Sequence, residues 1–276
     1  MSEKPTETEL QWAREIKKAA IADPLIDAEA VTDWEFLQHG IVAKEQTKKA
    51  VERLRNLQSF KEHYGIQHWN GSVEDAKRDL QTFVRTHPNF FLSLGESKQQ
   101  ATSSTTSTTS TTNPQVLCFA YRNFNAQVMK HSKEALAIYL RAAYYVLNAS
   151  QYKLSALRSG LAVIVDCQGM NPNRNYSRQA EIQARELFIH GYPIRIHTSA
   201  MLQTFTLMRI LYQLIKPFLS RKLVQVLCAP SNGVEYLAQW PKEALPSAWG
   251  GTCPDFLETI VQRLQKRQQI MDTFRL

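Results

Sequence analysis

The sequence predicts an α/β protein in which a helical N-terminal lobe precedes a mixed five-stranded sheet flanked by helices. Three observations support this fold class. The first 86 residues place apolar side chains at helical spacing throughout. Five later stretches have strand character, and helical stretches separate those that follow the first two, an order typical of layered α/β domains. One of the five, Leu161–Val165, is apolar on both sides, as expected of an interior strand.

Length and charge narrow the class of protein. A chain of 276 residues can bury a sizeable core. It has no run of about 18 uncharged apolar residues, so we expect no membrane-spanning helix. Its polar, acidic start is unlike a signal peptide. The net charge of +8 fits nucleic acid or an anionic membrane as a partner, and it equally fits an ordinary solvated surface.

Four cysteines lie far apart along the chain, at positions without the close pairing of a metal site: Cys118, Cys167, Cys228 and Cys253. We therefore expect free, buried thiols and a reducing compartment, which predicts a cytoplasmic protein.

The N-terminal lobe is predicted to contain four helices. Thr6 and Glu9 form a capping box that opens the first helix, and Asp23-Pro24 ends it. A second helix surrounds residues 32–38. The third spans residues 44–64 and the fourth begins near Ser72. The side chains expected to be buried on these last two helices are Ala50, Leu54, Leu57, Phe60, Ala76, Leu80, Phe83 and Val84.

The first two strands are predicted at residues 87–95 and 116–121. Residues 102–112 between them are all Ser or Thr. Such residues have no apolar surface to offset an ordering cost of about 1–2 kcal/mol per residue, so we expect a disordered loop over residues 97–113. This loop is either a bland expanded repeat or a phosphorylated or glycosylated regulatory segment. A helix beginning at Ser132 leads from these strands to the interior strand.

The stretch from Gly191 to Leu219 is predicted to be a strand followed by an apolar helix. Tyr192, Ile194 and Ile196 alternate with Arg195 and His197, which is the period of a strand. From residue 206 the apolar period becomes helical, and Pro217 ends the helix near residue 216.

Two helices and one strand complete the prediction. Ser177 caps the helix that leads into Gly191, and residues 223–227 form the last strand. A C-terminal helix begins at Pro254-Asp255, and we expect Lys266 and Arg267 to lie near its end, where they would favour the helix dipole.

Three of these segments together resemble the lipid-binding domain of the CRAL-TRIO family. They are the strand and apolar helix closed by Lys216-Pro-Phe-Leu219, the segment Leu161-Ala-Val-Ile-Val-Asp-Cys-Gln-Gly169, and Leu245-Pro-Ser-Ala-Trp-Gly-Gly251. The resemblance covers roughly residues 35–256. It implies a lobe at 1–86 like the one that precedes the family's domain, a lipid-binding domain at 87–256, and a separate C-terminal helix at 257–276.

The resemblance also implies an apolar cavity that holds one lipid beneath a mobile gate helix, residues 206–216. An apolar lining suits an acyl or isoprenoid chain. The positions that match the family's pocket and gate are Leu161, Val165, Met170, Leu187, Phe188, Ile194, Ile196, Leu207, Met208, Leu211 and Ile215.

The residue after Pro193 distinguishes two branches of the family. The phosphatidylinositol-transferring branch has Glu there, whereas this chain has Ile194, so the headgroup position resembles the tocopherol-transfer and retinaldehyde-binding type. Lys222 nevertheless matches a Lys of the first branch. In the second type, basic residues outside the cavity contact a membrane phosphoinositide. The matching residues are Arg195, His197, Arg221 and Lys222; the alternative is an ordinary solvated strand edge.

Motifs for catalysis are absent from the sequence: there is no phosphate loop, dinucleotide fingerprint, zinc-binding His pair or nucleophile elbow. Asp166 at a strand end is either a catalytic carboxylate or the cap of the following turn, and the second interpretation is favoured. The sequence thus predicts a monomeric, non-enzymatic lipid carrier without cofactor, metal or nucleic acid, which exchanges its cargo at anionic membranes. The alternative is an interaction module of the same fold that binds small GTPases or scaffold proteins. Sterols, tocopherols, retinoids and phospholipids all remain open as cargo.

Overall fold

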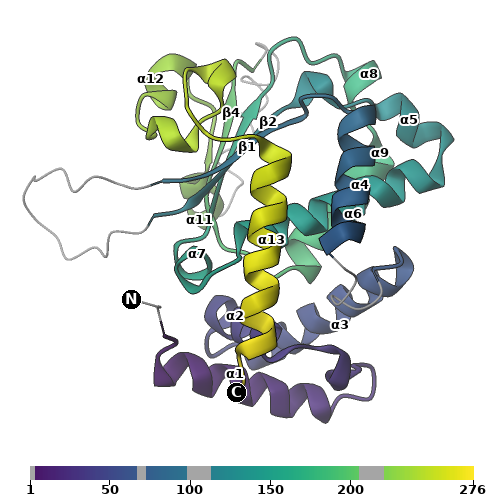
Figure 1. Cartoon of the computed structure of the whole chain (residues 1–276), viewed down its shortest axis with the longest axis vertical. Coiled ribbons are helices and arrows are strands. Elements are labelled where there is room, and N and C mark those ends of the chain that lie inside the picture. Colours follow the sequence, from purple (N-terminus) through teal and green to yellow (C-terminus); the bar gives the residue numbers. More distant parts are fainter. Residues whose placement is uncertain (1–3, 67–72, 98–112, 205–220) are drawn as a thin grey trace, which may run out of the picture.

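The computed structural model describes residues 4–66, 73–97, 113–204 and 221–276 (Figure 1). It has the predicted mixed α/β fold, with the first three helices at one end, the sheet at the other, and a long C-terminal helix running between them. The predicted Ser/Thr-rich loop and the predicted gate helix lie outside the described residues. Among the residues described, no helix combines the length and apolar character needed to cross a bilayer.

The N-terminal helices form as the sequence predicts. The Thr6 hydroxyl accepts a hydrogen bond from the Glu9 amide at 3.2 Å, and the Thr6 amide donates to the Glu9 carboxylate at 2.8 Å. A second capping box, Thr32 with Glu35, opens the next helix. These helices are α1 (Glu7–Ile21), α2 (Asp33–Ala43), α3 (Thr47–His63) and α4 (Val73–Thr86).

The sheet has the strand order β1-β2-β3-β4-β5. β1 pairs antiparallel with β2, and the remaining pairs are parallel, so the sheet is mixed. β3 is the central strand, as its apolar sequence predicts. The strands are β1 (Phe91–Glu96), β2 (Gln115–Ala120), β3 (Leu161–Asp166), β4 (Ile196–Leu202) and β5 (Leu227–Cys228).

Helices fill the connections and cover the sheet. Ser132 caps α6 as predicted, by accepting a hydrogen bond from the Ala135 amide at 3.1 Å. The predicted helix after Ser177 forms as α9 and continues into a π-helical segment, Glu186–Gly191. The remaining helices are α5 (Ala126–His131), α6 (Lys133–Ser150), α7 (Leu154–Ser159), α8 (Pro172–Asn175), α9 (Arg178–Arg185), α11 (Arg221–Val226), α12 (Gly233–Leu237) and α13 (Phe256–Thr273).

Two strand predictions are partly wrong at their starts. Residues 87–90 form a turn, in which the Phe90 amide donates to the His87 carbonyl at 3.1 Å, so β1 begins at Phe91. Residues 192–195 also lie outside the ladder apart from one bond, from the Leu161 amide to the Arg195 carbonyl at 2.8 Å. Pro193 has no amide hydrogen to donate, and β4 begins only at Ile196.

The prediction of a strand at 223–227 is wrong. The chain forms α11 up to Val226, and only Leu227 and Cys228 pair with β4. A short apolar run fits both periods, and its position in the fold decides between them. The Thr198 hydroxyl on β4 donates to the Val226 carbonyl at 3.2 Å, which holds the end of α11 beside the sheet.

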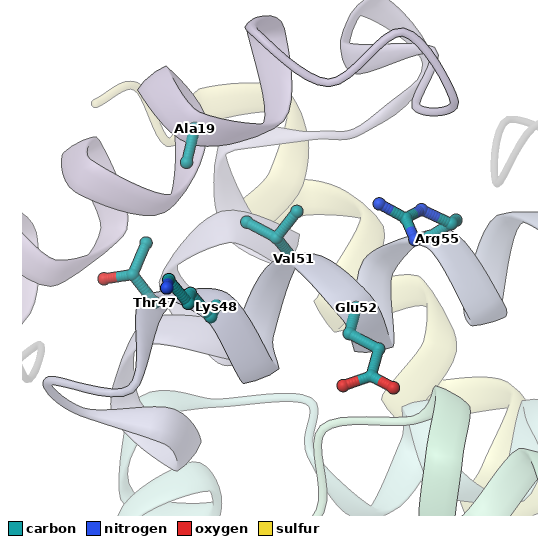
Figure 2. A pocket seen from close by; sticks show the side chains of 6 residues that line it. All are labelled: Ala19, Thr47, Lys48, Val51, Glu52 and Arg55. Carbon is teal, nitrogen blue, oxygen red and sulfur yellow. The ribbon is translucent and has the colours of Figure 1, made fainter.

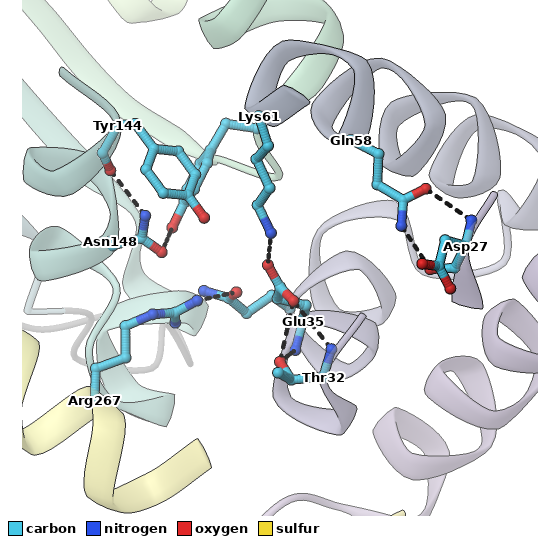
Figure 3. A network of polar contacts seen from close by, with 10 residues as sticks. Asp27, Thr32, Glu35, Gln58, Lys61, Tyr144, Asn148 and Arg267 are labelled. Carbon is cyan, nitrogen blue, oxygen red and sulfur yellow. Dashed lines mark hydrogen bonds and ion pairs between the residues drawn. The ribbon is translucent and has the colours of Figure 1, made fainter. Parts of the chain in front are cut away.

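Arg267 does not lie at the end of its helix, contrary to prediction. α13 continues to Thr273, and Arg267 is fully buried. Its guanidinium donates to the side-chain oxygen of Gln38 on α2 at 3.0 Å (Figure 3). The arginine therefore joins α13 to the N-terminal lobe and does not serve the helix dipole.

The same buried interface holds an ion pair between α2 and α3. Lys61 donates to the Glu35 carboxylate at 2.6 Å (Figure 3). Burial alone would raise the pKa of Glu35, but the charge and hydrogen bond of Lys61 outweigh it and lower the pKa to about 2. Nearby, the Tyr192 hydroxyl donates to Asn148, whose amide donates to the Tyr144 carbonyl. The Glu35–Lys61 ion pair thus joins two helices of the lobe, and the hydrogen bonds of Tyr192, Asn148 and Tyr144 lie beside it in the sheet domain.

Candidate functional site

The central sheet has two faces that differ in how completely they are covered. Ladder register assigns the residues to each face, because directly paired residues point the same way. Val163 pairs with Leu117 on one side and with Ser199 on the other. Ile164, the next residue, pairs with Cys118 and Ala200 and therefore faces the opposite side.

The closed face contains Ile164, and its central side chains are fully buried. They form one apolar cluster with residues of the segment after β5. α12 and the chain around residues 241–251 lie over this face (Figure 1). The fully buried members on the strands are Val116, Cys118, Ala162, Ile164 and Ala200.

The open face contains Val163, and it is covered only in part. Near β1 its residues pack under α4, α6 and α13, in the main core. Toward β4 and β5 the side chains are uncharged, and most of them are half-buried. The half-buried ones are Phe119, Val163, Ser199, Met201 and Leu227, whereas Val165, between Phe119 and Met201, is buried.

The predicted pocket residues divide into several groups. Leu161 and Leu187 are fully buried within the main core, and Phe188 and Ile194 are half-buried against the same cluster. Val165 lies on the open face. Ile196, by contrast, is 37% exposed at the start of β4. The gate positions Leu207, Met208, Leu211 and Ile215 lie outside the described residues.

Met170 lies at a different place, beyond the carboxyl end of β3. It lines a cavity of about 420 Å³ between the chain ends that follow β3 and β4. The other lining residues are Cys167, Gln168, Gly169, Pro172 and Gln203. Carboxyl ends of parallel strands are a usual place for ligands in α/β folds.

Sequence reasoning missed three apolar residues of the open face: Phe119, Val163 and Met201. The period of a strand would have placed Val163 on the same side as Val165. Phe119 and Met201 come from other strands, and only the ladder register assigns them to that side.

The predicted basic patch lies at the opposite end of β4. Arg195 and His197 are exposed, and the Arg195 guanidinium donates to the Arg158 carbonyl at 2.9 Å. Partial burial of the ring, together with the charge of Arg195, lowers the pKa of His197. Arg221 and Lys222 begin α11, which packs along β4. The four positions therefore lie on adjacent elements.

Asp166 caps the turn after β3, which is the interpretation that the sequence favours. One carboxylate oxygen accepts a hydrogen bond from the Gln168 amide at 2.9 Å, and the other lies 3.8 Å from the Arg122 guanidinium. Within the described part of the chain, no group of three or more His, Cys, Asp or Glu side chains is placed to hold a metal ion.

The Leu245–Gly251 segment is a tight turn that requires both glycines. Gly250 has a φ of 77°, in the left-handed region that favours glycine. A Cβ on Gly251 would lie 2.0 Å from the Leu245 carbonyl oxygen, so only glycine fits there. The turn brings Ala244 and Leu245 onto the closed face.

A comparison of the sequence with models of known families identifies one family. The sequence model of the CRAL/TRIO domain matches residues 110–251, just over half of the chain. The match includes β2 to β5 and the Leu245–Gly251 turn. The chain belongs to the CRAL/TRIO domain family. This is a family of lipid-binding domains, as the sequence resemblance indicated.

Other comparisons add little to the CRAL/TRIO assignment. The crystal structure of Sfh5 aligns with a TM-score of 0.49 at 13% sequence identity, over 98% of this chain and 99% of that one. No curated protein sequence matches the chain.

Proposed function

We propose that this CRAL/TRIO protein is a non-enzymatic carrier that binds one hydrophobic molecule against the open face of its sheet. The observation that supports this function is the difference between the two faces. The central side chains of the closed face are fully buried, whereas Phe119, Val163 and Met201 on the open face are only half-buried. In this proposal, residues 87–256 form the lipid-binding domain.

The open face suits an apolar ligand because it offers no charge that would have to be desolvated. Burial of a ligand methylene there contributes about 0.8 kcal/mol, so a long hydrocarbon binds with few polar contacts. β4 ends at Leu202, close to the start of the predicted gate helix 206–216. The predicted gate segment therefore follows the end of the sheet where Val165 and Met201 lie.

Exchange of cargo is proposed to occur at anionic membranes, including those that contain phosphoinositides. Each Lys or Arg near such a surface contributes about 1 kcal/mol. Arg195, Arg221 and Lys222 supply this charge, whereas the lowered pKa of His197 reduces the contribution of that side chain. Ile194 favours the tocopherol-transfer type of headgroup site over the phosphatidylinositol-transferring type.

Native mass spectrometry before and after incubation with liposomes tests the carrier. We expect one copurifying or acquired lipid per chain. Val163→Trp should fill the open face and lower lipid occupancy about tenfold or more, because the larger ring takes ligand volume. Val234→Trp is the matched control, since Val234 is 78% exposed on α12.

Leu211→Glu, in the predicted gate, should also abolish uptake. Absence of lipid from the wild-type protein under all conditions would contradict the proposal.

The basic patch is tested separately. Replacing Arg195, Arg221 and Lys222 by Glu should weaken sedimentation with phosphoinositide liposomes, without loss of lipid already bound. Unchanged sedimentation would remove the patch from the proposal.

One observation favours the alternative, an interaction module that carries no lipid. Leu161 and Leu187 are fully buried by their own neighbours, so this part of the predicted pocket is filled. Under that alternative, neither Val163→Trp nor Val234→Trp would change lipid occupancy, because the wild type itself would carry no lipid.

A further inference from the structure

Two large apolar side chains on the N-terminal lobe are held in solvent. Ile21, the last residue of α1, is 66% exposed, and Leu25 in the following turn is 67% exposed. Both lie outside the part of the chain that matches the CRAL/TRIO domain. They are the most exposed large apolar residues of the described lobe.

The turn that carries Leu25 is fixed at both ends to α3. Asp23 forms an ion pair with Arg55 at 2.5 Å, and its carboxylate also accepts a hydrogen bond from the Leu25 amide at 3.0 Å. On the other side, Asp27 exchanges two hydrogen bonds with the Gln58 side chain, at 3.1 and 2.6 Å. The adjacent Ile26 is buried. Leu25 is thus presented by a braced turn.

A groove of about 410 Å³ between α1 and α3 adjoins this turn. Ala19 and Val51 give it apolar walls, and Figure 2 shows Lys48 and Arg55 on either side of Val51. Glu52 is the acidic side chain among its lining residues. Arg55 lines the groove and is paired with Asp23, so the groove borders the turn that carries Leu25.

Exposed lysines lie on both helices that form the groove. Lys18 lies on α1, and Lys48 and Lys49 lie in the first turn of α3. That turn contains no acidic residue, and its N-cap, Gln46, makes no side-chain capping bond, so the positive end of the helix dipole adds to the lysine charges. Among the residues described, none of these three lysines forms an ion pair, whereas nearby Lys17 is paired with Asp33.

We propose that Ile21, Leu25, Lys18, Lys48 and Lys49 form a membrane-docking surface, the α1–α3 surface, that binds anionic lipid bilayers. Apolar side chains inserted among acyl chains and lysines at the headgroups are the combination by which proteins lie on such an interface. Nucleic acid would use the lysines but leave both apolar side chains in water. The surface is separate from the gate and from the basic patch at β4, and it provides a second contact that fixes how the molecule lies on the bilayer.

Sedimentation of the full chain with phosphatidylcholine vesicles, with and without phosphatidylserine, tests the apolar part. The Ile21→Glu/Leu25→Glu variant should bind serine-lipid vesicles about tenfold more weakly or worse, because charge replaces inserted apolar surface. Val234→Glu is the matched control and should bind as the wild type does. Thermal unfolding should be unchanged in both, since all three sites are exposed. Equal binding by the wild type and the double variant would overturn the proposal.

A second pair of variants tests the charges. Lys18→Glu/Lys48→Glu/Lys49→Glu should reduce binding by at least about tenfold at low salt. The control reverses three exposed lysines elsewhere, Lys130, Lys133 and Lys266. An equal loss in the two triple variants would show attraction by net charge alone and would overturn a localised surface.

Insertion itself is measured with brominated lipids, which quench tryptophan at membrane depth. The added tryptophan of Leu25→Trp should be quenched by these vesicles, and the added tryptophan of Val234→Trp should not be quenched. Equal quenching of the two variants would exclude insertion at Leu25. These experiments record vesicle binding, whereas the carrier proposal fails if native mass spectrometry finds no cargo. A failure of the α1–α3 surface is therefore distinguished from a failure of the carrier proposal.

Discussion

Val163 and Ile164 are neighbours on one strand, yet they occupy different environments. Ile164 is fully buried beneath α12 and the Leu245–Gly251 turn, whereas Val163 is half-buried on the open face. From Leu161 to Val165, β3 is apolar on both faces. The difference therefore arises from the layers that cover the sheet, and it separates residues that stabilise the fold from residues available to a ligand.

The largest expected effect comes from truncating each neighbour in turn. Ile164→Ala should lower the free energy of unfolding by about 2–5 kcal/mol, because it leaves a cavity in a closed layer. Val163→Ala should cost about 1 kcal/mol or less, because its side chain is already partly solvated. Denaturant unfolding measures both variants. Equal losses of stability would show that the open face is as fully packed as the closed one, and the comparison would fail.

The helical lobe and the central strand were largely predictable, and the open face was not. Capping boxes and helical spacing act locally, so Thr6, Glu9 and the buried side chains of α3 follow from sequence alone. The central place of β3 also follows from its apolar run. Membership of the open face depends on ladder register between distant strands, which joins Phe119, Val163 and Met201.

The errors have a similar physical origin. The run at 223–227 fits both a helix and a strand, and the contact of Thr198 with Val226 is formed only in the folded chain. Arg267 has the charge of a surface residue, so its burial against Gln38 could be read only from the packing of α13 on α2.

A smaller effect is expected on the pH dependence of stability. It distinguishes the open face of the sheet from the interface with the N-terminal lobe. Phe119, Val163, Val165, Ser199, Met201 and Leu227 on the open face do not ionise, whereas His39 on α2 is a buried ionisable side chain. Burial lowers the pKa of His39 to about 3 and that of His87 to about 4. The unfolded chain, with a His pKa near 6.5, then binds protons that the folded chain does not. Stability should therefore fall as pH decreases from about 6.5, whereas lipid occupancy should not.

His39→Phe tests this assignment. Between pH about 6.5 and 4.5, before Glu35 contributes, the slope of unfolding free energy against pH should decrease by about one proton relative to the wild type. A slope that is the same in the wild type and His39→Phe would show that His39 is protonated in the folded protein.

The smallest effect is expected at Asp166, which follows Ile164 on the closed face. Asp166→Asn keeps an oxygen to accept the Gln168 amide and loses only the charge 3.8 Å from Arg122, whose side chain is 45% exposed. Stability should change by less than about 1 kcal/mol. Lipid occupancy should not change, because the carboxylate points away from Val163 and Met201.

Asp166→Ala, which also removes the acceptor, should cost more stability than Asp166→Asn while leaving occupancy the same. A loss of occupancy in Asp166→Asn at unchanged stability would mean that the ligand reaches the closed face, and the division of the sheet into a structural and a binding side would be wrong.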